Sequence, residues 1–342
     1  MKHWSFPADR ALDALCLGRA GVDLYAVQEN TALEDVQTFR KSVGGSPANI
    51  ATAIARLGGK AGVIGVISND GLGRYVRAFL RANGVSDAGL KTVSGRSLNS
   101  LALTEVRPQD CQVVIYRQDA ADLQITAADI DATLIASSAS LLITGTALSA
   151  SPSREACFYA LELARRANTT AILDLDYRPY GWESAAQASA ILMRACELAD
   201  IVIGNRDEFD VLEYSSSGSD RNDAQSAQRV LRGNTKVAVV KDGAQGCKIF
   251  FADGEYLSQG IFPVAARKPF GAGDAFAGTL IWALRSGQSW SEAARLGAAA
   301  AAINVSRDAC ADAMATQDEL LAFVAGHPQF LSTNEPSLKV TL

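Results

Sequence analysis

The sequence contains only two histidines, His3 and His327, and both lie near an end of the chain. A Ser-His-Asp site, a Cys-His site or a histidine-ligated metal site would have to recruit one of them. The scarcity of histidine therefore argues against all three kinds of site. We expect the chemistry to rest on carboxylates, lysines, arginines and backbone amides.

Closely spaced cysteines are also missing. No Cys-x-x-Cys occurs among the six cysteines, which are Cys16, Cys111, Cys157, Cys196, Cys247 and Cys310. This spacing gives no support to zinc-ribbon or thioredoxin-like chemistry and favours free thiols in a reducing compartment.

Long apolar runs and an excess of basic charge are absent as well. The longest run of small apolar residues is Ala298–Ile303, far below the ~20 residues that a membrane span needs. Residues 1–10 lack the apolar core of a signal peptide. The net charge of −5, from 32 basic and 37 acidic residues, argues against nucleic acid as the main partner. We expect a cytoplasmic protein that binds neither membranes nor nucleic acids.

The 342 residues, 48% apolar and 20% charged, have the composition of a globular protein with two domains or one large α/β unit. Continuous apolar runs, typical of strands buried on both faces, are Ala14–Gly18, Ala61–Ile67, Leu141–Thr144, Ala171–Asp174, Ile201–Gly204 and Val237–Lys241. Helix-like segments lie between them, at Pro47–Leu57, Gly73–Asn83, Pro152–Ala167, Ala185–Leu198 and Ala224–Leu231. This alternation predicts a parallel sheet with helices on both faces.

Two stretches, Asp23–Val43 and Leu98–Gln124, alternate polar and apolar residues without a helical partner. They predict antiparallel strands of a small accessory sheet, which would form a lid over the carboxyl ends of the main strands. Leu257–Ala266 is a candidate connecting strand, and Ser215–Asp223 is a polar loop. No interdomain linker is evident, so we expect one domain over residues 1–342.

The segment Gly271-Ala272-Gly273 directly precedes a strongly helical run, and Asp274 follows it. Backbone amides at such a helix N-terminus form an anion site. Asp274 fits two roles: a cap of the helix, or a general base beside an oxyanion-stabilising group of amides. The second role suits removal of a proton from a hydroxyl that attacks a phosphoryl group.

A second glycine segment, Gly44-Gly45-Ser46-Pro47-Ala48-Asn49, precedes another helical run. Paired glycines let the backbone approach a ligand closely, and Pro47 suits the first turn of a helix. Asn49 would then present a polar side chain in that turn. A helix start beneath a tight turn, without any ligand, explains the same pattern.

Polar residues follow several predicted strands, where an open α/β sheet exposes its ligand site. They are Asp23, Asp174, Asp176, Arg178, Asn205, Glu208, Lys241, Asp242, Gly243 and Gly246. Each alone fits a surface cap or turn, but four consecutive strands ending this way favour a shared site. Arg117, at the end of a predicted lid strand, fits either a partner for a substrate carboxylate or a solvated strand end.

Two nucleotide-binding motifs are absent. The chain has no Gly-x4-Gly-Lys-[Ser/Thr], which excludes a P-loop, and no Gly-x-Gly-x-x-Gly after the first strand, which weakens a dinucleotide-binding interpretation.

Taken together, the segments Gly44–Asn49 and Gly271–Asp274 resemble the two signatures of the ribokinase-like (PfkB) carbohydrate kinases. The resemblance runs from Leu15 to Leu320 and implies a three-layer α/β/α fold with a mostly parallel central sheet and a β-sheet lid. Further segments resemble the sugar-acid kinases of myo-inositol catabolism; they are Gly18–Tyr25, Tyr116-Arg117, Asp174–Pro179 with Trp182, Lys268–Gly271 and Val305–Met314. Lys268-Pro269-Phe270 stands where the family usually has Asp-Thr-Thr, a departure that weakens the expectation of a potassium site built as in ribokinase.

The resemblance also implies a role for each matching residue. Asp274 matches the catalytic base, and Gly271, Ala272 and Gly273 the anion hole. The substrate-binding set is Asp23, Gly45, Asn49, Arg117 and Arg178, of which the two arginines would bind the acid's carboxylate. Asn205 and Glu208 match the element that organises Mg²⁺, through waters. The nucleotide-binding set is Lys241, Gly243, Gly246, Ala300 and Asn304.

The implied activity is transfer of phosphate from ATP, with Mg²⁺ and room for a monovalent cation, to the C6 hydroxyl of 5-dehydro-2-deoxy-D-gluconate. The alternatives are 2-keto-3-deoxygluconate, fructose or ribose as the acceptor, or a kinase-like sensor that binds a sugar acid without turnover. Two arginines in the pocket favour an acid over a neutral sugar. The exposed edges of the lid would allow a homodimer.

Overall fold

The computed structural model describes residues 4–214, 221–330 and 338–339. Within these residues the main sheet comprises β1 (Ala14–Leu17), β4 (Ala61–Ser68), β5 (Ser86–Val93), β8 (Ser140–Thr144), β9 (Thr170–Asp174), β10 (Ile201–Asn205), β11 (Val237–Lys241), β12 (Cys247–Phe251), β13 (Glu255–Gln259) and β14 (Leu338–Lys339). Their order across the sheet is β14-β13-β12-β11-β10-β9-β8-β1-β4-β5.

From β11 to β5 every neighbouring pair is parallel, whereas the pairs that join β11, β12, β13 and β14 are antiparallel. The predicted parallel sheet is therefore confirmed. All residues of β1, β4, β8 and β9 are buried, which explains why these strands have continuous apolar runs instead of alternating patterns.

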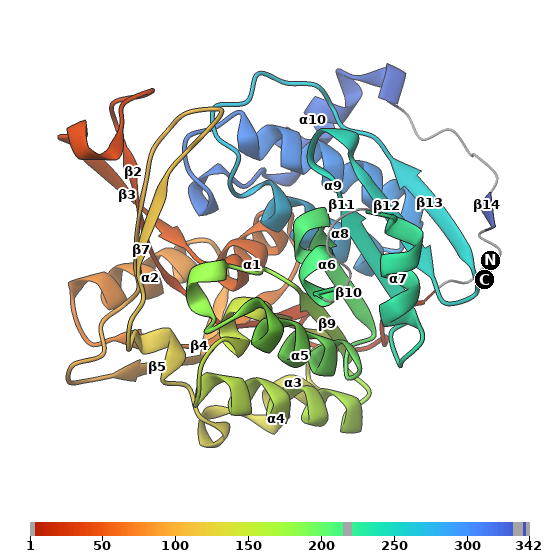
Figure 1. Ribbon diagram of the computed structural model, residues 1–342, viewed down its shortest axis with the longest axis horizontal. Coiled ribbons are helices and arrows are strands. Elements are labelled where there is room, and N and C mark those ends of the chain that lie inside the picture. The colour runs from red at the N-terminus through yellow and green to blue at the C-terminus, as the bar shows by residue number, and fades with distance from the viewer. Residues whose placement is uncertain (1–3, 215–220, 331–337, 340–342) are drawn as a thin grey trace.

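Helices cover both faces of the sheet (Figure 1). They are α1 (Ser46–Arg56), α2 (Gly71–Ala82), α3 (Ala132–Ala136), α4 (Ser153–Arg166), α5 (Ala185–Cys196), α6 (Arg206–Leu212), α7 (Asp223–Leu231), α8 (Ala272–Arg285), α9 (Trp290–Val305) and α10 (Gln317–Ala325). One core cluster joins the sheet to α1, α2, α8, α9 and α10, and a second joins its opposite face to α3, α4, α5, α6 and α7. Ala14 and Cys16 belong to the first cluster, and Leu15 and Leu17 to the second, as the two-residue period of a strand requires.

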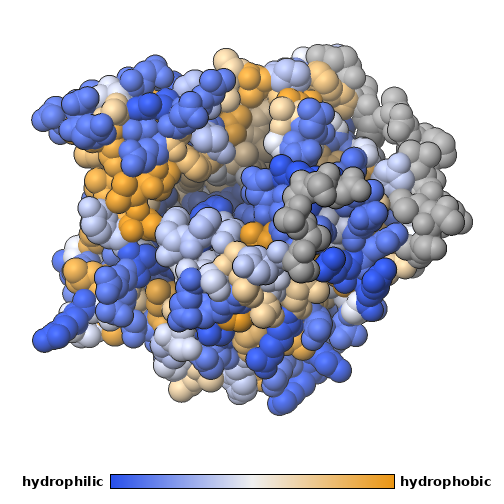
Figure 2. Space-filling model, viewed as in Figure 1, coloured by the Kyte–Doolittle hydropathy of each residue, from blue (hydrophilic) through white to orange (hydrophobic). Residues whose placement is uncertain are grey.

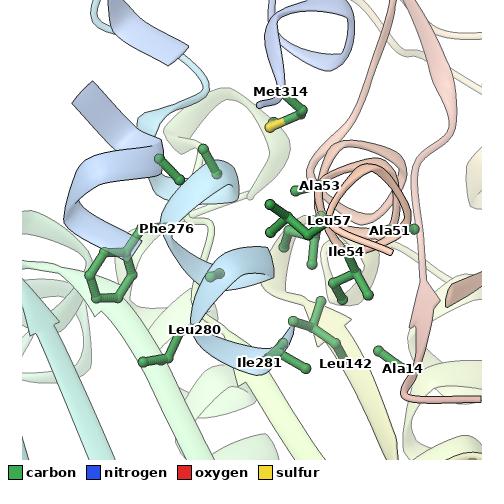
Figure 3. Close-up of a cluster of buried hydrophobic side chains, with 14 of the residues drawn as sticks. Ala14, Ala51, Ala53, Ile54, Leu57, Leu142, Phe276, Leu280, Ile281 and Met314 are labelled. Carbon is green, nitrogen blue, oxygen red and sulfur yellow. The ribbon is translucent and has the colours of Figure 1, made fainter. Parts of the chain in front are cut away.

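Close packing of α1 against α8 determines where the two glycine segments meet. A Cβ at Gly278 of α8 would lie 2.7 Å from the Cβ of Ala53 and 2.9 Å from the carbonyl oxygen of Ile50, so α8 needs a glycine there. Figure 3 shows the apolar layer beneath this contact, with Ile54 of α1 and Ile281 of α8 close to the sheet. The first turns of α1 and α8 consequently lie next to each other.

A smaller sheet stands away from the main body (Figure 1) and comprises β2 (Gly21–Ala26), β3 (Phe39–Gly44), β6 (Leu101–Thr104) and β7 (Val113–Tyr116). Its order is β3-β2-β6-β7. The expected accessory sheet, called the lid below, is thus present, with β2 beginning before Asp23 and β3 ending after Val43. The space-filling view shows apolar surface on this lid and a hollow between the lid and the body (Figure 2).

Three local predictions differ from the structure or fall partly on residues that the structure does not describe. We expected antiparallel lid strands, but β2 and β6 pair in parallel, because the chain enters both after strands of the parallel sheet, β1 and β5. The expected strand Leu257–Ala266 is β13, which begins at Glu255 and ends at Gln259. Of the expected loop Ser215–Asp223, residues 215–220 lie outside the described residues, and Asp223 begins α7. None of the described helices is both long and apolar enough to cross a membrane.

Candidate active site

Apart from Asp23, which lies within β2 of the smaller sheet, the polar residues predicted at strand ends lie along one edge of the main sheet. In the strand register, Thr144 of β8 pairs with Asp174 of β9, and Asn205 of β10 pairs with Lys241 of β11. Because these strands are parallel neighbours, their carboxyl ends meet at the same edge. The structure thus brings together the strand-end residues that the sequence predicted to share a site.

The predicted anion site forms the start of α8. Gly271 is the N-cap residue with a φ of 87°, in the left-handed region. A Cβ on Gly271 would lie 2.5 Å from Oδ1 of Asn304 and 2.8 Å from Sγ of Cys310, so only glycine fits. The amides of the first helical turn have no partners within an α-helix, and here they belong to Ala272, Gly273 and Asp274.

Lys241 adds positive charge beside this turn. Its Nζ lies 3.1 Å from the point where a Cβ on Gly273 would stand, and 3.7 Å from Oδ2 of Asp174. Burial lowers the pKa of Lys241, but the nearby carboxylates, Asp174 first, outweigh it and leave the pKa raised. A cation therefore stands next to amides that are suited to an anion.

Asp274 lies in the first turn of α8, but its carboxylate does not fill the N-cap position. Oδ2 of Asp274 accepts a hydrogen bond of 2.7 Å from Nδ2 of Asn49, which lies in the first turn of α1. Burial, and next the nearby charge of Asp176, raise the pKa of Asp274 from 3.8 to about 6. A carboxylate with a pKa in this range is a suitable general base at neutral pH.

Other carboxylates surround Asp274. Arg178 contacts Asp176 at 2.8 Å and Glu208 at 3.5 Å, and 43% of the Arg178 side chain is exposed. Oδ2 of Asp176 also accepts a 2.8 Å hydrogen bond from Thr146. Burial raises the pKa of Asp174 and raises that of Glu208 to about 7. The acidic cluster is thus only partly neutralised, which suits a site that receives cations.

The two residues predicted to organise Mg²⁺ also start α6. Oδ1 of Asn205 accepts from the amide of Glu208, and Oε2 of Glu208 accepts from the amide of Asn205, each at 2.8 Å. This capping box uses one oxygen of each side chain. Oε1 of Glu208 faces Arg178, so this pair fits a hydrated Mg²⁺ reached through waters better than direct ligation. Among the described residues no three His, Cys, Asp or Glu side chains are grouped to hold a metal.

On the lid side, Asp23 is buried and paired. Its Oδ1 accepts a 2.8 Å bond from Arg19, and its Oδ2 lies 3.4 Å from the hydroxyl of Tyr25. Gly45 has a φ of 104°, and a Cβ there would collide with the carbonyl of Arg19. At Gly45, the close backbone approach that the paired glycines predict is therefore an approach to Arg19 of the same chain.

Arg117 is not a solvated strand end. Only 9% of its side chain is exposed, and it contacts Oδ2 of Asp122 at 2.6 Å and the carbonyl of Thr146 at 3.0 Å. Asp122 is itself 2% exposed, so the two form a buried ion pair. Of the two predicted arginines, Arg178 presents more surface to an incoming carboxylate.

The predicted nucleotide residues fall into two groups. Lys241, Gly243 and Gly246 lie at and after the end of β11, and both glycines have positive φ. Ala300 and Asn304 lie on α9 and are 3% and 0% exposed. The Asn304 side chain accepts from Lys268 and donates to the carbonyl of Cys310.

Sequence reasoning did not identify Arg19, Asp122, Thr146 or Lys268 as contributors to this region. Arg19 and Lys268 lie inside segments used for the family resemblance, so a signal existed for them. Asp122 and Thr146 had none. Thr146 pairs with Asp176, 30 residues further along the chain, and the residue pattern around Arg117 and Asp122 does not show that the two are buried together.

The chain is similar to known proteins in both sequence and fold. The family model described as "pfkB family carbohydrate kinase" matches residues 11–317, and the chain belongs to this family. Two similar relatives are named 5-dehydro-2-deoxygluconokinase. The one from Photobacterium profundum is 49% identical over 94% of this chain and 98% of its own. The one from Bacillus thuringiensis subsp. konkukian is 40% identical over 93% and 96%.

Solved structures agree on the fold. A PfkB protein from Polaromonas sp. JS666 is 26% identical, with a TM-score of 0.80 over 91% of this chain and 100% of its own. A putative ribokinase II from E. coli, in complex with ATP and Mg²⁺, is 22% identical, with a TM-score of 0.83 over 92% and 100%. The expected ribokinase-like architecture and the assignment to the carbohydrate kinases are confirmed.

Proposed function

We propose that this protein is a 5-dehydro-2-deoxygluconokinase. It would transfer the γ-phosphoryl group of ATP to the C6 hydroxyl of 5-dehydro-2-deoxy-D-gluconate, giving the 6-phosphate. The observation that carries the proposal is the position of Asp274, a carboxylate bonded to Asn49 and one residue from the amides of Gly271–Gly273. The names of relatives 40–49% identical over nearly the whole chain support this acceptor.

In the proposed reaction Asp274 accepts the proton of the C6 hydroxyl as that oxygen attacks the phosphoryl group in line. The amides of Gly271, Ala272 and Gly273 donate hydrogen bonds to the phosphoryl oxygens, where negative charge is spread in the transition state. Lys241, at the same turn, compensates that charge. Positioning and electrostatic stabilisation are the main demands of phosphoryl transfer, and these residues meet both.

Substrates would bind on either side of Asp274. Asp23, Gly45 and Asn49 would contact the sugar hydroxyls, and Arg178 and Arg117 its carboxylate. The nucleotide would lie along Lys241, Gly243 and Gly246, with Ala300 and Asn304 near the adenine. Mg²⁺ would be held through waters by Asn205 and Glu208, and when bound it neutralises phosphate charge.

Two features of the cellular setting belong to the same proposal. All six cysteines are free thiols, which supports a reducing compartment such as the cytoplasm. The lid presents outer strands, β3 and β7, that a second copy of the chain could cover to form a homodimer.

A coupled ADP-release assay with MgATP tests the acceptor. The panel contains 5-dehydro-2-deoxygluconate, 2-keto-3-deoxygluconate, fructose and ribose. The proposal predicts turnover largely confined to the first acid, with kcat/KM reduced in Arg178→Ala and unchanged in Arg166→Ala, a variant of an exposed arginine at the end of α4. Preference for a neutral sugar would overturn the substrate but leave the role of Asp274 intact. Binding of the acid with no turnover would favour a sensor.

A further inference from the structure

A completely buried lysine lies behind the anion site and has no part in the mechanism above. Lys268 is 0% exposed and lies three residues before Gly271. Its Nζ donates to the carbonyl of Phe270 at 2.5 Å, to the carbonyl of Asn304 at 3.2 Å and to Oδ1 of Asn304 at 2.9 Å. In the part of the chain that the structure describes, no carboxylate lies within salt-bridge distance of it.

The three acceptors indicate that the group is charged. An ammonium has three N–H donors, whereas a neutral amine has only two, so three acceptor contacts match the charged form. All three acceptors are uncharged oxygens, and two of them are main-chain carbonyls. Neutral carbonyl oxygens around a single positive charge are also what proteins use to bind potassium.

The position of this charge bears directly on the anion site. In a trans peptide the carbonyl and the amide point in opposite directions. Since the Phe270 carbonyl points at Lys268, the N–H of Gly271 in the same peptide points away from the ammonium. The second partner, Oδ1 of Asn304, is the atom that a side chain on Gly271 would strike. Lys268 therefore links the loop that ends in Gly271 to the end of α9.

We propose that the ammonium of Lys268 is a built-in monovalent cation for the anion hole, so that the kinase needs no added potassium. It orients the Phe270–Gly271 peptide and places a fixed positive charge behind the amides that would hold the phosphoryl group. The proposal rests on the anion-hole role of Gly271–Gly273 in the proposed function. Lys268 is a positioning residue, since it acts through Phe270 and Asn304 rather than on substrate.

The first test uses the unmodified enzyme and compares Na⁺, K⁺ and tetramethylammonium salts at one ionic strength. The expected turnover is the same in all three. A strict requirement for K⁺ would overturn the proposal, because it would show that the cation position is not filled by Lys268. This comparison uses whichever acceptor the enzyme phosphorylates, so an error in the proposed substrate appears in the acceptor panel and leaves the cation result readable.

The second test removes the ammonium. Lys268→Met should lower kcat by about 10- to 100-fold, somewhat less than loss of a direct oxyanion donor, while KM for the acceptor changes little. Lys268→Ala leaves space, so K⁺ or NH₄⁺ should partly restore its kcat and raise its melting temperature without affecting that of the unmodified enzyme. Lys60→Met, at an exposed position before the amino end of β4, is the matched control and should retain full activity.

Two results would overturn the proposal in these variants. The first is a wild-type kcat in Lys268→Met. The second is a folded Lys268→Ala whose kcat and melting temperature respond to none of the small cations, since a purely structural lysine would give that result. If Lys268→Ala does not fold, the kcat of Lys268→Met and the cation series with the unmodified enzyme still test the proposal.

Discussion

Asn49 donates a 2.7 Å hydrogen bond to the carboxylate of Asp274, although 225 residues separate them in the sequence. The contact joins the first turns of α1 and α8, each of which begins at a glycine with positive φ. Gly278 allows the two helices to approach closely enough for it. The two glycine segments thus form one site because the helices that follow them pack together.

This hydrogen bond predicts a specific pH dependence. The acid limb of kcat/KM reports the free enzyme's base, so activity should fall as pH drops through about 6, where Asp274 becomes protonated. The bond from Asn49 lowers the pKa of Asp274, so Asn49→Ala should move the acid limb to higher pH. A pH profile of kcat/KM from pH 5 to 9 measures both, and an acid limb that stays in place in Asn49→Ala would contradict the assignment.

Ionisation of Asp274 should lower the stability of the fold, although activity requires it. Its pKa is raised from 3.8 to about 6 by folding, so the folded state binds more protons and the ionised group destabilises it as pH rises through 6. At pH 8 the free energy of unfolding of Asp274→Asn, measured by chemical denaturation, should therefore exceed that of the unmodified enzyme by at most about 3 kcal/mol. This difference in unfolding free energy should become smaller as the pH is lowered to 5. A lower unfolding free energy for Asp274→Asn than for the unmodified enzyme at pH 8 would contradict this prediction, because it would mean that the buried, ionised carboxylate does not destabilise the fold.

The Arg117–Asp122 pair predicts a coupled effect. Arg117→Met leaves Asp122 buried without its partner, which should cost about 3–5 kcal/mol of unfolding free energy. The double variant Arg117→Met/Asp122→Leu should recover most of that loss, as chemical denaturation can measure. If Arg117 binds the substrate carboxylate, the recovered double variant should still have a raised KM for the acid. A KM equal to that of the unmodified enzyme would assign Arg117 to the fold alone.

Gly271 should tolerate no side chain. Gly271→Ala combines positive φ with contacts to Asn304 and Cys310, so both activity and stability should fall. Gly84 also has positive φ but no atom within 4 Å of a Cβ, which makes Gly84→Ala the matched control. The control should cost about 1–2 kcal/mol and keep its kcat. Equal kcat losses in the two variants would mean that the effect comes from backbone strain alone, not from the anion site.

Much of the central architecture could be predicted from the sequence, because a strand buried on both faces must be apolar along its whole length. β1, β4, β8, β9, β10 and β11 were identified on this basis. β5 and β12 were not: β5 has exposed positions along an edge strand, so it lacks a continuous apolar run, and β12 pairs antiparallel beyond the parallel part. The direction of β2 relative to β6 also depends on how the chain leaves the main sheet, which residue patterns do not record.

The candidate site was predictable to the extent that glycines and strand-end polar residues mark it. Gly271, Gly45 and Lys241 were found because helix starts and strand ends have local signals. The contacts of Arg117 with Thr146 and of Lys268 with Asn304 were not predicted, since they depend on which distant segments pack beside them. The alternative that Arg117 is solvated was wrong because Asp122, five residues further along the chain, is itself buried and pairs with Arg117.

The role of Asp274 as the base is the central claim, and steady-state kinetics of Asp274→Asn at saturating MgATP tests it most directly. Loss of a general base predicts a kcat lower by about 10²–10⁴-fold in a folded variant. The matched variant Asp318→Asn, at an exposed aspartate in the first turn of α10, should behave like the unmodified enzyme. A near-normal kcat in Asp274→Asn would contradict the account.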